Sequence, residues 1–86
     1  MHLTYTLQID DKVIKDLKKI DKTWQKRILN KIKTVLVTDP YSGKKLVGNL
    51  SPFYRLRVGD YRIIYAILED VVAVEVVKIK HRKDVY

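Results

Sequence analysis

Residues 54–68, YRLRVGDYRIIYAIL, decide the fold of this chain. Apolar residues alternate with arginines over 54–58, which is the period of a strand with one buried face. Gly59-Asp60 then supplies a short turn of the kind that closes a β-hairpin, and residues 61–68 are apolar or aromatic except for Arg62. The stretch predicts two antiparallel strands, and the second is expected to be covered on at least part of both faces.

The segments on either side extend this hairpin into a meander. Glu69-Asp70 offers a second turn, and residues 71–79 form a run rich in β-branched residues that predicts a third strand. Upstream, residues 39–52 contain both prolines and two of the three glycines, so they are expected to form a loop. The C-terminal half of the chain therefore predicts three antiparallel strands.

The N-terminal part of the chain predicts one strand and two helices. Residues 2–9 alternate between apolar and polar, as in a half-buried strand. Asp10 or Asp11 can cap a first amphipathic helix, and Asp21 can cap a second helix that ends at Thr38-Asp39-Pro40. The apolar stripe of the second helix consists of Trp24, Ile28, Leu29, Ile32, Val35 and Leu36.

The order β-α-α-β-β-β predicts an α+β domain that spans residues 1–86. In this fold the helical hairpin packs on one face of a four-stranded, mainly antiparallel sheet, and the other face of the sheet is open. A chain of 86 residues can build only one core of this kind.

The composition favours an anionic partner. The 18 Lys and Arg residues against 10 Asp and Glu residues give a formal net charge of +8. The partner of such a chain is typically nucleic acid, a membrane surface or an acidic protein, although a basic domain without such a partner has the same charge. On the predicted helices, solvation is the simplest role for any single lysine, and the helix pair could also steer RNA; the basic residues concerned are Lys22, Lys26, Arg27, Lys31 and Lys33.

Several classes of site and location are not expected from the sequence. Cysteine is absent, which removes disulfides and thiolate ligands and suits a reducing cytosol. Residues 1–12 lack the pattern of a signal peptide, and no apolar run approaches the ~20 residues of a membrane span, so a cytoplasmic protein is expected. His2 and His81 are far apart in the sequence, and the acidic pairs at 10–11 and 69–70 fit helix caps and turns. No metal ion or cofactor is therefore expected.

Two clusters of polar residues are candidates for a functional site. Arg55 and Arg57 are two apart in a strand and must project from the same face, and Arg62 lies across the turn on the next strand. Guanidinium groups bind phosphate oxygens in a bidentate manner, so the three arginines predict a phosphate site. The simpler alternative is that each arginine covers the sheet edge and reaches water. The second cluster is the basic tail, with Lys78, Lys80, His81, Arg82, Lys83 and Tyr86.

The chemistry of these clusters fits the cleavage of RNA by its own 2′-hydroxyl. A base removes the hydroxyl proton, cations stabilise the charged phosphorane, and an acid protonates the leaving oxygen. Histidine gains and loses a proton near neutral pH, and tyrosine can also donate one, so His81 and Tyr86 are candidates for proton transfer. A lone histidine is more often structural or solvated. DNA lacks the 2′-hydroxyl and cannot react in this way.

The motifs YRLRVGDYRIIY and HRKDVY, in this order and spacing, resemble the RelE family within the RelE/ParE superfamily of bacterial and archaeal toxins. The resemblance covers nearly the whole chain. It implies a RelE-like fold and a toxin of a type II toxin–antitoxin system that enters the ribosomal A site, cleaves messenger RNA there and so inhibits translation. It also implies a cognate RelB-like antitoxin, acidic or amphipathic, that forms a hetero-oligomer with the toxin.

The resemblance also implies roles for single residues. The positions that match the family's functional residues are Arg55, Arg57, Arg62, Arg82 and Tyr86, with Lys80 as a competing match for the late cation and His81 as a candidate general acid or base. Arg62 and Arg82 are expected to stabilise the transition-state phosphate, and Tyr86 to stack on a base or move a proton. Arg55 or Arg57 is expected to orient the phosphate and assist proton transfer. The expected RNA contacts are Lys44, Lys45, Lys78, Lys80 and Lys83.

Two other functions are compatible with the sequence. A ParE-like protein uses the same fold to inhibit DNA gyrase without cutting RNA. It does not need the arginine-and-tyrosine set, so the presence of that set favours the nuclease. A non-catalytic nucleic-acid-binding module would also fit the net charge of +8, although most of the aromatic residues that it would use for stacking, such as Phe53, Tyr54 and Tyr61, are more simply explained as core residues.

Overall fold

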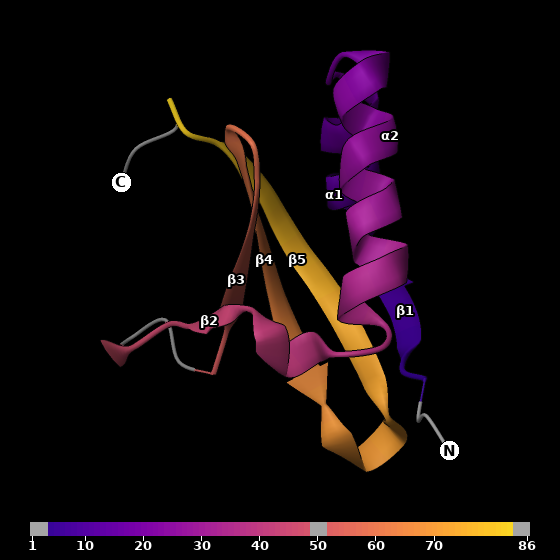
Figure 1. Ribbon diagram of the computed structural model, residues 1–86, viewed down its shortest axis with the longest axis vertical. Helices are drawn as coiled ribbons and strands as arrows, with labels where there is room; N and C mark the ends of the chain where they lie inside the picture. The colour runs from indigo at the N-terminus through magenta and orange to yellow at the C-terminus, as the bar shows by residue number, and fades with distance from the viewer. Residues whose placement is uncertain (1–3, 49–51, 84–86) are drawn as a thin grey trace.

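The computed structural model describes residues 4–48 and 52–83. Figure 1 shows two helices lying along one side of a twisted sheet, with the first and last strands next to each other. The elements are β1 (Thr6–Ile9), α1 (Asp11–Lys18), α2 (Lys22–Lys31), η1 (Ile32–Leu36), η2 (Pro40–Ser42), β2 (Lys44–Lys45), β3 (Tyr54–Val58), β4 (Tyr61–Leu68), η4 (Glu69–Val71) and β5 (Ala73–His81).

The strands form one sheet in the order β1-β5-β4-β3-β2. β1 runs parallel to β5, and the other neighbours are antiparallel. The predicted hairpin over residues 54–68 is confirmed, because β3 and β4 pair around Gly59-Asp60. The α+β class is likewise confirmed, and β4 and β5 are inner strands, as their apolar sequences predicted.

The predicted strand count of four is corrected to five. The additional strand is β2, which falls in the segment predicted as a loop and pairs antiparallel with β3. A strand of two residues is too short to show any alternation, and here it is formed only because the outer edge of β3 offers unpaired backbone groups. The backbone N–H of Leu46 donates to the carbonyl of Phe53 at 2.9 Å and extends this pairing by one step.

The last strand begins and ends two residues later than the β-branched run predicted. Residues 69–71 form a 3₁₀ turn, and Val72 follows it with a left-handed φ of 51°. β5 therefore runs from Ala73 to His81 instead of from residue 71 to residue 79. β-branched residues favour strands but do not mark where a strand starts. The 3₁₀ turn at the start of the β-branched run was therefore not predicted. The shift brings His81 into the sheet.

Both predicted helix caps are present. The carboxylates of Asp10 and Asp21 accept hydrogen bonds from the backbone N–H groups of Lys12 and Thr23, each at 3.0 Å. The second helix differs from the single helix predicted, because α2 gives way to the π-helical turn η1 before Thr38. In η1 the N–H of Val37 donates five residues back to Ile32 at 3.3 Å.

The core lies between the helices and one face of the sheet. The helices contribute Val13, Leu17, Ile28, Ile32 and Leu36, and the strands contribute Ile63, Tyr65, Val74, Val76 and Ile79. No helix in the described parts of the chain is long and apolar enough to span a membrane. The opposite face of the sheet carries no helix in the described residues and holds the candidate site (Figure 1).

Candidate functional site

Six basic side chains project from the open face of the sheet. Residues that are registered across antiparallel strands share a face, and the register pairs Arg57 with Arg62 and Arg62 with Lys80. A second row lies about 7 Å away along the strands. In this row Lys44 is registered with Arg55, Arg55 with Ile64, and Ile64 with Lys78. The two rows define the cation face, which consists of Lys44, Arg55, Arg57, Arg62, Lys78 and Lys80.

The charges on this face repel one another. Arg57 and Arg62 are directly opposite across the β3–β4 ladder, where like charges are destabilising. Within the described strands, Glu75 is the one acidic residue that the register places on the same face, next to Ala66 and away from the arginines. An anion with several oxygen atoms, such as a phosphate, would offset this repulsion by bridging the guanidinium groups. The arrangement therefore fits phosphate binding better than solvation.

The turn between β3 and β4 fixes the arginines at one end of the face. Arg57 Nε donates to the carbonyl of Gly59 at 3.2 Å. Gly59 has a left-handed φ of 58° and lies directly against the Trp24 ring of α2, where a side chain would clash. Arg55 and Arg62 are half-buried and Arg57 is exposed. Packing of Gly59 against Trp24 thus positions the turn, and with it Arg57 and Arg62, which flank the turn.

Arg82 lies at the end of β5, close to the same turn. Its backbone N–H donates to the carbonyl of Asp60 at 2.7 Å, and its Nη1 lies 3.6 Å from Asp60 Oδ1. Both side chains of this ion pair are at least half exposed, so the pair adds little stability. The backbone bond holds Arg82 beside the Gly59-Asp60 turn, two residues beyond Lys80 along the chain.

His81 is registered with Tyr61 and faces the helix layer, on the side of the sheet opposite the cation face. Its ring lies edge-on to Tyr61 with the centroids 4.9 Å apart. His81 Nδ1 accepts a hydrogen bond from the backbone N–H of Lys83 at 3.1 Å, which helps to hold the ring in this orientation. The structure therefore places His81 on the opposite face of β5 from Lys78 and Lys80, with which the sequence analysis grouped it in the basic tail.

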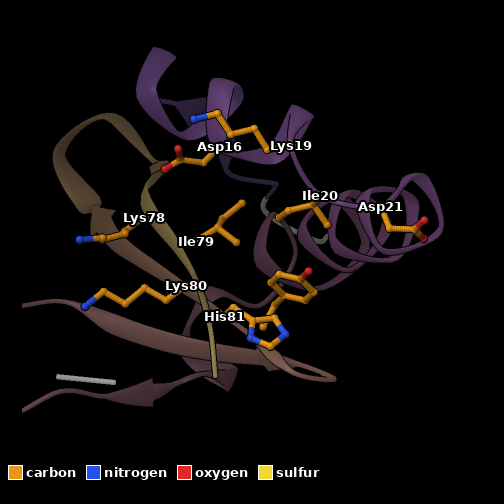
Figure 2. Close-up of a pocket in the computed structure, with 9 residues that line it drawn as sticks. Asp16, Lys19, Ile20, Asp21, Lys78, Ile79, Lys80 and His81 are labelled. Atoms are coloured by element: carbon orange, nitrogen blue, oxygen red, sulfur yellow. The ribbon is translucent and has the colours of Figure 1, made fainter. Parts of the chain in front are cut away.

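Figure 2 shows this separation directly. Lys78 and Lys80 extend to one side of β5, whereas Ile79 and His81 lie on the other side, which is also the side of Ile20 and Asp21. The residues drawn in Figure 2 line an open pocket of about 640 Å³ between β5 and the end of α1. The alternation Lys78-Ile79-Lys80 around the buried Ile79 is the sequence signal that separates the two sides.

The remaining predicted site residues are peripheral or lie outside the described residues. Lys45 is registered with Tyr54 on the opposite side of β2 from Lys44. Lys83 is exposed just beyond β5. Tyr86 lies outside the described residues. Within residues 4–48 and 52–83, no group of three His, Asp or Glu side chains is placed to hold a metal ion.

The tyrosines with shifted pKa values lie away from the cation face. The phenol of Tyr41 donates to Glu69 Oε1, and this hydrogen bond is the main reason that the pKa of Tyr41 rises to about 12. Tyr5 also donates to Glu69 Oε1, at 3.2 Å, and its pKa is raised chiefly by desolvation. Burial raises the pKa of Tyr65 to about 12, and its hydroxyl donates to the carbonyl of Pro40 at 2.6 Å. The hydrogen bonds of these three tyrosines therefore join segments that are distant in the sequence.

Known proteins share both the sequence pattern and the fold. Residues 7–86 match the model of the family described as ParE toxin of type II toxin-antitoxin system, parDE. The mRNA interferase toxin RelE of Escherichia coli is 26% identical over 87 residues, which cover 98% of this chain and 92% of that protein.

Two solved structures resemble the whole fold. The RelBE2 toxin–antitoxin complex of Mycobacterium tuberculosis contains a chain that superposes with a TM-score of 0.88 at 25% identity, covering 95% of each chain. The archaeal RelE–RelB complex of Pyrococcus horikoshii gives a TM-score of 0.79 at 29% identity, covering 95% of this chain and 99% of the other.

The fold, the cation face and these matches define the class of the protein as a toxin of a type II toxin–antitoxin system. Within that class, the chain belongs to the ParE toxin family of the RelE/ParE superfamily. The RelE-type toxin predicted from the two sequence motifs is confirmed by the RelE relatives and by the RelBE structures.

Proposed function

We propose that the chain is an endoribonuclease that cleaves messenger RNA in the ribosomal A site, in the cytoplasm, and so inhibits translation. The observation that carries this proposal is the row of Arg57, Arg62 and Lys80 across three neighbouring strands of an open face. The Escherichia coli relative is named an mRNA interferase, which supports messenger RNA as the substrate.

In the proposed reaction the message lies across the cation face with the scissile phosphate against Arg62. The 2′-oxygen loses its proton to a base and bonds to phosphorus, and the bond from phosphorus to the 5′-oxygen breaks as that oxygen takes up a proton. The products are a 2′,3′-cyclic phosphate and a 5′-hydroxyl. The fixed cations of the face stabilise the phosphorane more than the ground state, which lowers the barrier. No metal ion takes part in this scheme.

The two proton transfers have several candidate groups. Lys80 is registered with Arg62 on the cation face, and Arg82 lies two residues further along the chain, beside the Gly59-Asp60 turn. His81 faces the helix layer, so its ring would have to act from beyond the end of the strand. The register therefore favours Lys80 over His81 for proton transfer, because Lys80 is a direct neighbour of Arg62 on the cation face. Tyr86 is proposed to stack on a base or donate a proton. The outer lysines, Lys44, Lys45, Lys78 and Lys83, are proposed to hold the RNA strand.

A cognate antitoxin is proposed to silence the toxin by covering the cation face. The two structural relatives described above are toxin–antitoxin complexes, which supports such a partner. An acidic segment would replace the phosphate as the counter-charge for Arg57 and Arg62. The proposed complex is therefore a hetero-oligomer whose formation competes with RNA binding.

The test is primer-extension mapping of a message during translation with the purified protein. Cleavage is expected at the codon in the A site, only when ribosomes are present. Arg62→Ala is expected to slow cleavage by about 10²-fold, while its affinity for ribosomes changes little, because the arginine acts mainly in the transition state. Lys12→Ala, on the outer side of α1, is the matched control. A message that stays intact would reject the enzymatic proposal.

The family match supports a second candidate function. Because the matching family is described as the ParE toxins, gyrase inhibition is the alternative. This candidate predicts that the purified protein blocks DNA supercoiling by gyrase while messages remain intact. A supercoiling assay run beside the primer-extension assay distinguishes the two.

A further inference from the structure

Arg82 lies just beyond the end of its strand, where a long side chain is ordinarily free to move. β5 ends at His81, and residues 82–83 form a turn. The Arg82 side chain is 63% exposed, and an arginine in such a place loses much rotamer entropy when it is fixed in one geometry. A guanidinium that has to meet a reacting phosphate in one orientation therefore benefits from a second group that orients it beforehand.

Asp60 contacts Arg82 in two independent ways. Its backbone carbonyl accepts from the Arg82 N–H at 2.7 Å, and its Oδ1 lies 3.6 Å from Arg82 Nη1. The first contact uses the backbone alone and does not depend on the side chain at residue 60. The second contact depends on the charge of the carboxylate. The carboxylate is therefore not needed to place the Arg82 backbone, and what it adds is the orientation of the guanidinium.

The neighbours of Asp60 in the sequence hold it in place. Gly59, directly before it, packs against the Trp24 ring. Tyr61, directly after it, lies 5.7 Å from Trp24 and 4.9 Å from His81, measured between ring centroids. Residues 59 and 61 are thus both anchored to the helix layer, so the carboxylate between them presents its charge at a defined place. A carboxylate on an unanchored loop would not orient its partner in this way.

Neither stability nor phosphate binding explains a negative charge at residue 60. Asp60 is the one acidic residue of the hairpin over residues 54–68, and it follows Arg57 and precedes Arg62. A carboxylate here repels an incoming phosphate, and its exposed ion pair adds little stability. Asparagine suits a tight turn as well as aspartate does, so the turn itself does not require the charge. The effect that remains is the one on Arg82.

We infer that Asp60 is a positioning residue, whose carboxylate orients the Arg82 guanidinium beside the turn that joins Arg57 and Arg62. The ion pair uses Nη1, so other N–H groups of the guanidinium stay available for a phosphate. In the proposed reaction the oriented guanidinium adds its charge to the stabilisation of the phosphorane, and Asp60 acts only through Arg82. The inference rests on the proposed nuclease and adds a residue to its machinery.

The test combines cleavage on programmed ribosomes with NMR relaxation of the Arg82 Nε–H group. Asp60→Asn keeps the turn and the backbone bond but removes the charge. We expect its maximal rate to fall about 10-fold, while the half-saturating concentration does not rise, because a charge that repels RNA is lost. The order parameter of the Arg82 Nε–H group should also fall. Asp70→Asn makes the same change of charge at an exposed residue of η4 and should match the parent.

Further variants separate positioning from a structural role. Asp60→Glu keeps the charge and should recover most of the lost rate and of the lost order. Arg82→Ala and Arg82→Ala/Asp60→Asn should be equally slow, because Asp60 has nothing to orient once the guanidinium is absent. In urea denaturation Asp60→Asn should unfold at the same midpoint as the parent, since an exposed ion pair contributes little.

Two sets of results are decisive. An Asp60→Asn variant with the full maximal rate, or with an unchanged order parameter at Arg82, would overturn the inference. So would a loss of rate that Asp60→Asn also causes in the absence of Arg82, or one that a lower urea midpoint explains. If the parent leaves messages intact, the proposed function fails instead, and the relaxation measurement alone then decides whether Asp60 orders Arg82.

Discussion

Lys80 and His81 are adjacent in the sequence but project from opposite faces of β5. Lys80 is aligned with Arg62 on the cation face, and His81 packs edge-on against Tyr61. This difference gives the two residues distinct roles if the protein is a nuclease. It also shows why a histidine near several cations in the sequence is a weak guide to catalysis, since strand alternation separates neighbours by the thickness of the sheet.

Lys80→Ala is expected to reduce the cleavage rate by about 10²-fold, because it removes a cation beside the reacting phosphate. His81→Asn is expected to keep most of the rate, since its ring lies on the other face. Single-turnover cleavage on programmed ribosomes measures both. The reverse order of effects would identify His81 as the group that transfers a proton.

Gly59 and Gly48 form a matched pair for a stability test. Both have a left-handed φ, 58° and 68°, but only a side chain at residue 59 would meet the Trp24 ring. Gly59→Ala is therefore expected to lower the free energy of unfolding by about 2 kcal/mol more than Gly48→Ala, through overpacking added to backbone strain. Urea denaturation measures the difference, and equal losses would show that the turn can move away from Trp24.

At the scale of elements, a hydrogen-bonded cluster joins three segments that are distant in sequence. Glu69 in η4 accepts from Tyr41 in η2 and from Tyr5 just before β1. The buried Tyr65 of β4 donates to Pro40 beside them. The cluster fixes the segment that leads into β2, and hence Lys44 at the edge of the cation face.

This cluster predicts a loss of stability at high pH. The pKa of Tyr41 is raised from 10.0 to about 12, so the folded state holds the phenol proton more tightly than the unfolded state. Its stabilising contribution is complete below about pH 10 and is lost as the pH rises toward 12. The difference in unfolding free energy between the parent and Tyr41→Phe should therefore shrink over this range in urea titrations. Ser42→Ala, which removes no titrating group, should show a constant difference.

The elements that the sequence predicted are those with a long and regular pattern. The β3–β4 hairpin and the caps at Asp10 and Asp21 are confirmed because alternation, turn residues and capping side chains all agree there. The strand β2, the turn before Ala73 and the π-helical turn after Lys31 depend on tertiary pairing and packing. Local sequence patterns do not record such interactions.

The candidate site was predictable only in part for a similar reason. Strand alternation placed Arg55 and Arg57 on one face and the hairpin brought Arg62 beside them, as the register shows. The addition of Lys78 and Lys80 depends on the pairing of β5 with β4, including the register shift between Ile64 and Tyr65. A shift of one residue moves every following side chain to the other face, and no property of the sequence marks it.

At the scale of the whole molecule, the cation face determines how RNA binding depends on salt. If single-stranded RNA contacts all six cations of the cation face, the logarithm of its binding constant should fall against the logarithm of salt concentration with a slope of about −4. Arg57→Ala/Arg62→Ala should reduce the magnitude of the slope to about 3. Anisotropy titrations of a short oligonucleotide in increasing KCl measure this, and an unchanged slope would place the RNA elsewhere.

The position of β5 in the sheet has a consequence for how the protein is made. β5 is the last described strand in the sequence, yet it lies between β1 and β4 and is the only strand that joins them. Until it has left the translating ribosome, the helices have no complete sheet to cover, and the row that ends at Lys80 does not exist. A nascent or prematurely terminated chain that lacks β5 therefore also lacks the row of Arg57, Arg62 and Lys80, and the cation face is complete only after this strand has been synthesised.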